Sequence, residues 1–296
     1  MDTLQKKDFP LFLQQITQIP ERIFLRGAPL QYDADYIAIV GTRVPSPYGR
    51  RMTYEIAKSL VECGVIVVSG LAFGVDFLAH KAAVDLGKPT VAFLASGVDR
   101  VTPSSHAAFA KEIVESGGSI LSEYENFDSA HKYRFLERNR LISGLCRATI
   151  VVEAKAKSGA LITARHAFEQ DREVYALVGD VDRAQSRGCL DLIERDMAQP
   201  ITSLDQLLRD LRLRKNLPQD DLSCAILATL EKKLMGMNDL CAVLKMSSAE
   251  VASTLMQLEI AGAIVRHQGK WMKMTTQKLL GRGGLLPDWG DPGLLG

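Results

Sequence analysis

Three consecutive segments give the chain its clearest pattern: Arg134-Phe-Leu-Glu-Arg-Asn-Arg-Leu-Ile-Ser-Gly-Leu-Cys146, Ala148-Thr-Ile-Val-Val-Glu153 and Lys155-Ala-Lys-Ser-Gly-Ala-Leu-Ile-Thr163. They predict a basic helix, a buried strand, and a lysine-bearing turn that opens another helix. Residues 131–172 carry nine basic and four acidic side chains, whereas the whole 296-residue chain has a formal net charge of +1. Positive charge concentrated at a strand-to-helix turn indicates an anion-binding site. The plainer alternative is a basic helix face that is merely solvated.

The same order of strand and helix recurs through residues 36–213. Short apolar runs predict six strands, at residues 36–40, 65–69, 90–94, 119–122, 149–152 and 173–177, with helices between them. Nearly continuous apolar runs are typical of strands that are buried on both faces. Strands that alternate with helices form a parallel sheet. The predicted fold class is therefore α/β, with helices on both faces of one parallel sheet.

Composition divides the chain into four parts. Residues 1–35 predict a helical lead-in, and residues 36–213 form the predicted α/β domain. A charged break that ends at Pro218 marks the domain boundary. Residues 220–275 predict three helices followed by a hairpin, which is the order of a winged helix-turn-helix and also that of a plain helical cap with a hairpin. Residues 276–296, rich in glycine and proline, predict a disordered tail.

The overall composition limits the class of protein. The chain has 36 basic and 35 acidic residues and a hydrophobic content of 47%, which fits a globular protein without a general coat of positive charge. Any contact with nucleic acid must therefore be a local patch. Five scattered cysteines with no Cys-x-x-Cys pair indicate reduced thiols and no zinc site. No apolar run approaches about 18 residues, and the N-terminus lacks the apolar core of a signal peptide, so we expect a cytoplasmic protein without a membrane span.

Three glycine-containing turns follow separate predicted strands: Gly41-Thr-Arg43, Ser69-Gly-Leu-Ala-Phe-Gly74 and Lys155-Ala-Lys-Ser-Gly159. In an open parallel sheet the carboxyl ends of the strands line one rim, where ligands bind in a crevice. Glycine lets a phosphate approach the backbone, and helix N-termini present N–H groups to it, although glycine is also common at such turns for geometric reasons alone. Arg43, Arg140 and Lys157 would add full charges. We expect these three side chains to meet at one anion-binding rim.

Signatures of catalysis are missing or incomplete. The sequence has no Gly-x-x-x-x-Gly-Lys-Ser/Thr and no Gly-x-Gly-x-x-Gly after the first strand, which argues against ATP hydrolysis and against a dinucleotide cofactor. Asp76 and His80, four residues apart on one helix, suggest a metal or acid–base pair, but such a pair is more often a packing contact. Glu123 and Glu153 lack a nucleophile as partner, and Ser158 lacks a Gly-x-Ser-x-Gly context. We therefore predict no enzymatic activity, no cofactor and no metal.

Six motifs follow one another along the predicted α/β domain: Ile39-Val-Gly-Thr-Arg43, Ser69-Gly-Leu-Ala-x-Gly-Val-Asp76, Ser122-Glu123, Arg138-Asn-Arg-Leu-Ile142, Val152-Glu-Ala154 and Lys157-Ser-Gly-Ala-Leu-Ile-Thr-Ala164. Together they resemble the DprA/Smf family of bacterial DNA-processing proteins, over roughly residues 9–212. The resemblance implies an extended Rossmann-like domain that binds single-stranded DNA, a homodimer, and loading of a RecA-type recombinase onto incoming DNA during natural transformation. Members often carry a C-terminal winged-helix domain and are not known as enzymes.

The predicted nucleic-acid-binding residues lie on the three turns and the basic helix. The motifs of the family place Arg43, Arg138, Asn139, Arg140 and Lys157 among them. The turns and the helices add Gly41, Thr42, Ser69, Gly70, Arg134, Lys155, Ser158, Gly159 and Thr163. The chain departs from the usual family pattern at Val178-Gly179, where Pro-Gly is usual, at Gly188-Cys189, where Gly-Asn is usual, and in the less glycine-rich residues 94–100.

Two other functions stay open from the sequence. Phosphoribohydrolases, which release bases from nucleoside monophosphates, have a similar fold, but their Pro-Gly-Gly-x-Gly-Thr-x-x-Glu pattern is missing, and Lys157-Ser-Gly159 stands in its place. A nucleotide-sensing module without DNA binding is the other alternative. Release of free base would identify the first, and tight mononucleotide binding without affinity for DNA would identify the second.

The third helix of the C-terminal unit, Ser247 to Glu259, carries two acidic residues and no basic one. It opens with the capping box Ser247-Ser-Ala-Glu250. A helix that enters the major groove should present Arg, Lys, Asn or Gln to base edges, and only Gln257 qualifies. Residues 220–275 as a whole carry six basic and six acidic side chains. We predict a role in protein interaction or weak duplex contact rather than sequence-specific recognition.

Overall fold

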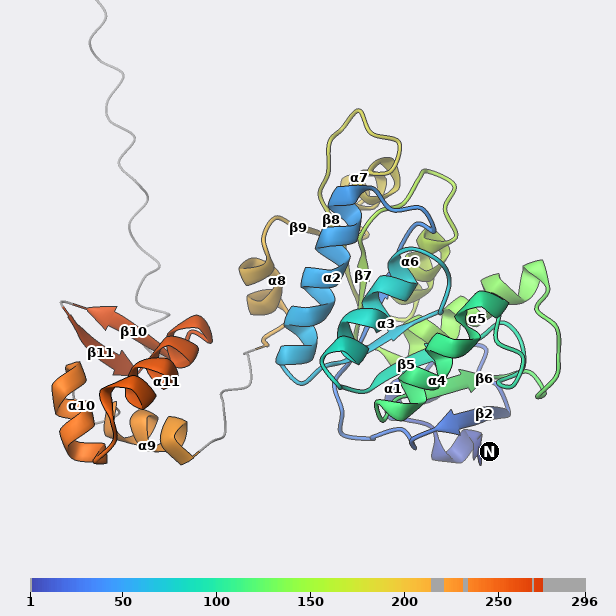
Figure 1. Cartoon of the computed structure of the whole chain (residues 1–296). Coiled ribbons are helices and arrows are strands. Elements are labelled where there is room, and N and C mark those ends of the chain that lie inside the picture. Colours follow the sequence, from blue (N-terminus) through green and yellow to red (C-terminus); the bar gives the residue numbers. More distant parts are fainter. Residues whose placement is uncertain (1, 214–220, 231–233, 268, 274–296) are drawn as a thin grey trace, which may run out of the picture. The chain divides into compact units, whose positions relative to one another are not determined.

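The computed structural model describes residues 2–213, 221–230, 234–267 and 269–273 (Figure 1). The chain divides into two compact units at the link between Arg214 and Lys215, inside the charged break of the sequence. The larger unit is the N-terminal one. Each unit is described by itself.

The larger unit is built on a sheet whose nine strands, in the part of the chain that the structure describes, run in the order β1-β2-β6-β5-β4-β3-β7-β8-β9. The strands are β1 (Asp2–Gln5), β2 (Arg22–Gly27), β3 (Tyr36–Val40), β4 (Ile66–Ser69), β5 (Thr90–Phe93), β6 (Ser119–Ser122), β7 (Ala148–Val151), β8 (Glu173–Leu177) and β9 (Gln199–Ile201). Neighbours from β6 to β9 are parallel, whereas β2 runs antiparallel to β6, and β1 to β2. The predicted α/β class is confirmed, although the sheet, which was predicted to be parallel, has two antiparallel strands at one side.

The winding of the sheet reverses direction at β3. From β3 the chain proceeds outward through β4, β5 and β6 on one side, and then returns to add β7, β8 and β9 on the other. A reversal of this kind leaves a crevice outside the carboxyl ends of the two strands at the switch point. The fold therefore places a crevice where β3 and β7 end.

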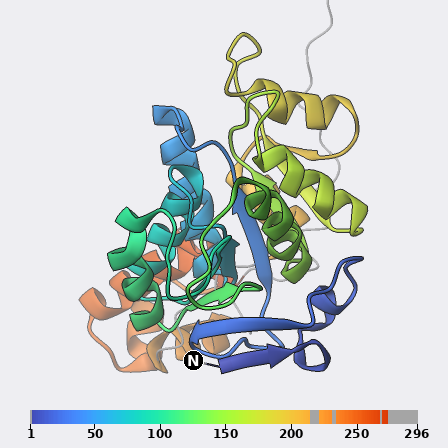
Figure 2. The same ribbon diagram turned by 90° about the vertical axis from the view of Figure 1, so that its right-hand side faces the viewer.

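Helices cover both faces of the sheet (Figure 2). One face carries α1 (Leu11–Gln14), α5 (Lys132–Leu145), α6 (Ala160–Glu169) and α7 (Arg187–Glu194). The other carries α2 (Pro47–Glu62), α3 (Val75–Asp85), α4 (Ala107–Glu115) and α8 (Leu204–Asp210). Short 3₁₀ turns, Lys6–Asp8 and Ser104–His106, precede α1 and α4. The arrangement is the predicted sheet with helices on both sides.

Strand β3 divides its side chains between two hydrophobic cores. Ala38 and Val40 belong to the core beneath α5 and α6, while Ile37 and Ile39 belong to the core beneath α2 and α3. All five residues of the strand are buried. Side chains alternate between the two faces of a strand, so burial on both faces explains the unbroken apolar run in the sequence.

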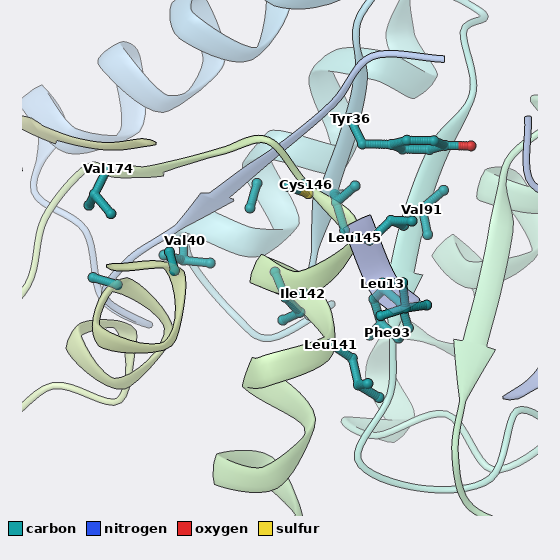
Figure 3. Packing of buried hydrophobic residues seen from close by; sticks show 14 of the residues in the cluster. Leu13, Tyr36, Val40, Val91, Phe93, Leu141, Ile142, Leu145, Cys146 and Val174 are labelled. Atoms are coloured by element: carbon teal, nitrogen blue, oxygen red, sulfur yellow. The ribbon is translucent and has the colours of Figure 1, made fainter. Parts of the chain in front are cut away.

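Helix α5 is anchored to the sheet by one apolar stripe. Leu141, Ile142 and Leu145 are buried in the same core as Val91 and Phe93 of β5 (Figure 3). Their spacing of one and three residues places them on one side of a helix. Burial of each such side chain contributes about 1.5–3 kcal/mol. This anchoring fixes how α5 is rotated about its axis and therefore where its arginines point.

The first 35 residues differ from the predicted helical lead-in. They form strands β1 and β2, and their only α-helix within the described residues is the four-residue α1. β2 buries Ile23 and Leu25 in the core beneath α5 and Phe24 in the core beneath α4, so it is packed on both faces like an internal strand. The flanking Pro20 and Pro29 interrupt no strand, because both lie outside β2. The prediction also misses β9, which is short and contains proline.

The smaller unit has the predicted order of three helices and a hairpin. Its elements are α9 (Asp221–Leu230), α10 (Met237–Leu244), α11 (Ser248–Ile260), β10 (Ile264–His267) and β11 (Lys270–Lys273), and the two strands are antiparallel. Leu240, Leu255 and Trp271 lie in its core. The capping box is present, with Ser247 Oγ accepting from the N–H of Glu250 at 3.3 Å. The predicted disordered tail lies outside the described residues, and no described helix is long and apolar enough to cross a membrane.

Candidate nucleic-acid interface

A pocket of about 290 Å³ opens where β3 and β7 end, at the switch point of the sheet. Turns that are far apart in the sequence meet there. The lining residues are Val40, Gly41, Thr42, Arg43, Ala72, Asp76, Phe135, Leu136, Arg138, Asn139, Ile142, Lys155, Lys157, Ser158, Gly159, Ala160 and Thr163. Of the fourteen sequence-predicted residues, the structure therefore brings ten to this pocket and leaves Ser69, Gly70, Arg134 and Arg140 outside its lining.

The turn after β3 is held by close backbone packing. The N–H of Thr42 donates to the carbonyl of Glu153 at 2.7 Å, and the carbonyl of Thr42 accepts from the N–H of Val75 at 3.2 Å. A Cβ at Gly41 would lie 2.6 Å from a methyl group of Val75, so only glycine fits this approach. Gly74, at a φ of +79°, is equally restricted by the carbonyl of Thr42. These contacts hold the backbone that carries Arg43 at the mouth of the pocket.

The exposed cations of the pocket are Arg43, Lys155 and Lys157. Within residues 2–213 none of the three forms an ion pair with an acidic side chain. The guanidinium of Arg43 lies 5.5 Å from the centre of the Phe135 ring, which leaves its N–H donors available. The positive end of the α6 dipole, at Gly159, faces the same space. This combination is suited to an anion.

Arg138 lines the pocket, and its guanidinium is hydrogen-bonded to the backbone of the fold. It is 4% exposed, and its Nη1 donates to the carbonyl of Gly70 at 2.9 Å and also to that of Phe93. The side chain therefore joins the ends of β4 and β5 from beneath α5. Burial lowers the pKa of Arg138 to about 10, and the neighbouring Asp76 carboxylate opposes that shift. The guanidinium stays charged at neutral pH and contributes a positive potential from beneath the pocket.

Asn139 and Thr163 complete the inner wall. The Nδ2 of Asn139 donates to the carbonyl of Gly159 at 3.3 Å, which ties the lysine-bearing turn to α5. Thr163 is buried on the first turn of α6. Ser158 Oγ accepts from the N–H of Ala160 at 3.3 Å and so stabilises the start of α6. These residues shape the pocket rather than supplying charge to it.

Asp76 and His80 do not form an acid–base pair. Asp76 Oδ2 accepts from the N–H groups of Gly70 at 3.1 Å and Ala72 at 3.4 Å, and burial raises its pKa while Arg138 opposes the shift. The Thr90 hydroxyl donates to the carbonyl of Val67, so His80 Nδ1, 2.7 Å away, must be the donor to Thr90 Oγ1. Burial lowers the pKa of His80 to about 3. Both side chains stabilise the fold through these hydrogen bonds. Separately, no group of three or more His, Cys, Asp or Glu that could hold a metal ion occurs in the described residues.

Ser69 and Gly70 lie behind the pocket wall. Ser69 Oγ donates to the carbonyl of Ile39 at 2.6 Å and is fully buried. Gly70 is also buried, between Asp76 and Arg138. Neither residue is placed to contact a ligand in the pocket, although both were predicted to do so from their turn.

Arg140 does not share a rim with Arg43 and Lys157, contrary to the prediction from the sequence. Its guanidinium makes a bidentate ion pair with Glu123, at 2.9 and 2.7 Å, and Nε donates to the carbonyl of Gln18 at 3.0 Å. The two side chains of the pair are 12% and 13% exposed. Residues two apart on a helix point about 200° away from each other, so Arg138 and Arg140 cannot both face the pocket. Arg140 joins α5 to the end of β6 instead.

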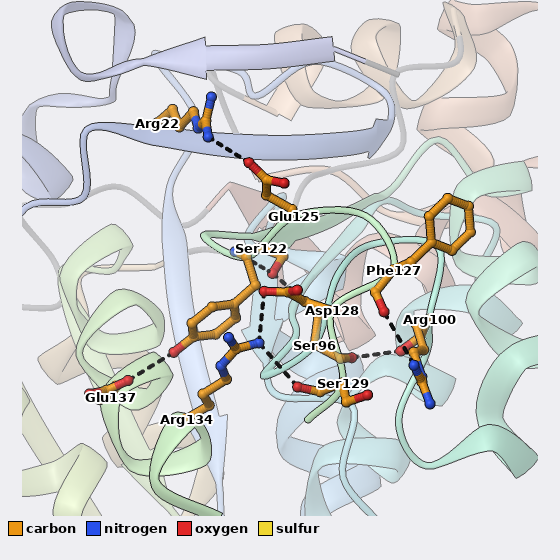
Figure 4. A network of polar contacts seen from close by, with 11 residues as sticks. Arg22, Ser96, Arg100, Ser122, Glu125, Phe127, Asp128, Ser129, Arg134 and Glu137 are labelled. Carbon is orange, nitrogen blue, oxygen red and sulfur yellow. Dashed lines mark hydrogen bonds and ion pairs between the residues drawn. The ribbon is translucent and has the colours of Figure 1, made fainter. Parts of the chain in front are cut away.

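The Arg134 side chain binds residues of the loop that precedes α5 (Figure 4). It pairs with Asp128 at 3.0 Å, donates to the carbonyl of Ser129 at 3.1 Å, and lies 4.1 Å from the centre of the Tyr124 ring. The tip of this loop exposes Phe127, whose carbonyl accepts from Arg100 at 3.3 Å. Arg134 thus stabilises a loop and does not line the pocket.

Sequence reasoning missed the apolar wall of the pocket. Phe135, Leu136 and Ile142 of α5 line it, together with Val40 at the end of β3. The spacing of Phe135, Asn139 and Ile142 is that of one helix face, and this face could have been extended from the predicted Asn139. Phe135 and Leu136 are partly exposed beside the cations, whereas Val40 and Ile142 are buried.

A second cavity of about 390 Å³ has the opposite character. It is lined by Glu153 and Asp180, and its one base, Arg183, is paired with Asp180 at 2.7 Å. Glu153 accepts from the N–H and the hydroxyl of Ser46, which caps α2. Despite its larger volume, this cavity is not suited to an anion.

The fold is a doubly wound α/β sheet, and the exposed cations at its switch point have no acidic partner within residues 2–213. This is the class of α/β fold in which ligands occupy the crevice at the carboxyl ends of the strands. Residues 1–212 match the family model of the DNA recombination-mediator protein A, and residues 213–270 match that of the DprA winged helix domain. The chain belongs to the DprA family. The resemblance found in the motifs and the expected winged-helix unit are thereby confirmed.

Relatives and solved structures agree with the family models. The chain is 32% identical over 280 residues to protein Smf of Escherichia coli, covering 90% of this chain and 75% of the relative. It is 34% identical over 209 residues to DNA processing protein DprA of Bacillus subtilis, covering 70% of each. The X-ray structure of DprA from Streptococcus pneumoniae superposes with a TM-score of 0.64 at 34% identity, covering 70% of this chain and 73% of that one. A Helicobacter pylori DprA structure, which concerns the single-stranded DNA binding mode of that protein, gives 0.65 at 30% identity, with coverages of 71% and 95%.

Proposed function

We propose that this protein binds single-stranded DNA in the pocket at the end of β3 and β7. The observation that carries the proposal is the set of three exposed cations, Arg43, Lys155 and Lys157, which face one pocket without acidic partners among the described residues. Asp76, the only acid in the lining among the described residues, is buried and accepts hydrogen bonds from backbone N–H groups. Phosphates of a DNA backbone supply the complementary charge.

The shape of the pocket favours a single strand over a duplex. Its cations border Phe135 and Leu136 of α5, which are not fully buried, so a phosphate and an unstacked base can be accommodated together. Binding of single strands without sequence preference combines these two elements. A duplex keeps its bases stacked and its backbone stiff, and a pocket of about 290 Å³ gives it no equivalent contact.

Within this proposal, the bound strand is protected and passed to a RecA-type recombinase during natural transformation, and the protein acts as a homodimer. Membership of the family supports these roles. The protein is proposed to act without catalysis. Asp76, the one acid in the lining, holds a backbone turn, and Ser158 Oγ accepts from a backbone N–H, so neither is paired with a base that would activate a nucleophile.

The experiment compares three ligands with the whole protein across a salt series. Fluorescence anisotropy of a labelled oligo-dT, the corresponding duplex and a nucleoside monophosphate would be measured from about 50 to 200 mM salt, the range over which counterion release is resolved. We expect the single strand to bind most tightly, with an affinity that falls steeply with salt. Equal or tighter binding of the duplex would overturn the proposal. Tight binding of the mononucleotide without affinity for DNA would instead identify a nucleotide sensor, and release of free base would identify a phosphoribohydrolase.

A further inference from the structure

The turn between β4 and α3, which reaches the pocket at Ala72, carries an exposed aromatic ring. Phe73 is 49% exposed, while its neighbour Ala72 lines the pocket. The turn has a fixed conformation, since Leu71 and Gly74 both adopt left-handed φ angles, +55° and +79°. Asp76 holds it from within by accepting the N–H groups of Gly70 and Ala72. The ring is therefore presented by a rigid segment.

The ring of Phe73 is supported from behind. It makes an edge-to-face contact with His106, at 4.7 Å between ring centres and 71° between planes. His106 is buried, and its Nδ1 donates to the carbonyl of Leu71 at 2.9 Å. On its other side His106 contacts Phe77 at 5.0 Å, and Phe77 contacts Phe109 at 4.6 Å. Phe73 is thus the outermost member of a series of packed rings and needs little further ordering to bind a ligand.

The same turn is packed against the backbone of Arg43. A Cβ on Gly74 would lie 2.6 Å from the carbonyl carbon of Arg43, so the residue after Phe73 touches the segment that carries the cation. A nucleotide joins an anionic phosphate to a flat base across one sugar. The exposed Phe73 and the exposed Arg43 lie on two backbone segments that touch, and single-strand binding uses an aromatic ring and a cation together.

The geometry points to a base-stacking subsite at Phe73, supported by His106, in which a nucleobase packs on the ring while its phosphate contacts Arg43. The inference rests on the proposed function and adds to it a second place where a base can pack, outside the lining that contains Phe135. Stacking is tolerant of sequence because every base has a flat face. The subsite would therefore strengthen binding of a single strand without selecting its bases.

The test separates contacts to bases from contacts to phosphates. Binding of oligo-dT would be compared with that of an abasic oligonucleotide of the same length, which keeps the phosphates and lacks the bases. We expect Phe73→Ala to weaken oligo-dT binding about tenfold, equivalent to about 1.4 kcal/mol, and to leave abasic binding and the salt slope unchanged. Phe73→Trp should retain or increase the affinity for oligo-dT. Lys157→Ala, by contrast, should weaken both ligands.

Phe168 provides the matched control. It has the same exposed fraction, 49%, but lies near the C-terminal end of α6, about 12 Å along the helix from Ala160 at the pocket. Phe168→Ala should leave both affinities unchanged. If Phe73→Ala destabilises the protein in a thermal melt, Phe73→Leu keeps an apolar contact with His106 and removes the flat face, and the same loss on oligo-dT alone is expected.

Three results would overturn the subsite. In the first, Phe73→Ala and Phe73→Leu bind oligo-dT as tightly as the unaltered protein. In the second, they lose the same affinity for oligo-dT and for the abasic oligonucleotide. In the third, they lose binding of a protein partner while their affinity for DNA is unchanged. These outcomes differ from failure of the proposed function. In that case the unaltered protein itself would bind oligo-dT no better than the duplex.

Discussion

The basic side chains of α5 and those of the turns after β3 and β7 carry the same charge but have different partners. On the α5 side, Arg134, Arg138 and Arg140 donate to backbone carbonyls or pair with acids. On the turn side, the cations have no acidic partner in the part of the chain that the structure describes. A basic stretch of sequence is therefore not sufficient to identify a DNA-binding surface. The partners of each side chain decide whether its charge is available to a ligand.

Removing Arg138 should have the largest effect, and the effect should be on stability. Arg138→Ala would leave two carbonyls and the buried Asp76 without their cation, and we expect a loss of about 3–5 kcal/mol in the free energy of unfolding. Urea denaturation of the whole protein would measure it. A loss of stability below about 1 kcal/mol together with weakened DNA binding would show that Arg138 contacts DNA rather than stabilising the fold.

Removing a cation of the turns should affect DNA affinity without affecting stability. We expect Arg43→Ala and Lys157→Ala each to weaken binding of single-stranded DNA by about 1.5–3 kcal/mol and to reduce the salt slope by about 0.7. Their melting temperatures should change little. Lys88→Ala is the control. Lys88 is also exposed, but it precedes β5 and so lies at the amino-terminal ends of the strands, away from the pocket at their carboxyl ends. Unchanged slopes in both pocket variants would contradict the shared site.

Arg140→Ala tests most directly whether a basic residue of α5 contacts DNA or stabilises the fold. Arg140 lies on the same helix as Arg138, two residues further along. Its ion pair with Glu123 is partly buried, so we expect a loss of about 1–2 kcal/mol in stability. The salt slope should be unchanged. Glu123→Gln, which keeps the shape of the partner, should reproduce the loss of stability. A reduced slope in Arg140→Ala with a normal melting temperature would show that Arg140 contacts DNA after all.

The smallest effect is expected from the C-terminal unit. A chain that ends at Pro218 should keep its affinity for single-stranded DNA to within about twofold, equivalent to about 0.4 kcal/mol. The exposed side chains of α11 include Met256 and Ile260, which offer no charge to a phosphate. This face fits a protein partner better than a DNA groove. A large loss of affinity in a truncated protein that melts normally would contradict this assignment.

The turns could be predicted from the sequence, whereas the roles of the α5 arginines could not. Glycines and lysines at the ends of apolar runs fix the turns locally, and the parallel sheet then brings them to one edge. The carbonyls that bind Arg138 are 68 and 45 residues away along the chain. Helical geometry shows that Arg138 and Arg140 diverge, but not which of them faces the pocket. That choice depends on how Leu141 and Leu145 dock on the sheet.

The antiparallel pair formed by β1 and β2 has a consequence for solubility. By pairing with β6, strand β2 satisfies the backbone groups of a strand whose residues, Ser119-Ile-Leu-Ser122, are entirely buried. β1 then becomes the edge of the sheet; three of its four residues are exposed, and Lys6 and Lys7 follow it. An edge strand that is short and flanked by charge is a poor template for pairing with another chain. A chain without residues 1–30 would instead present β6, an apolar edge of the kind that promotes aggregation.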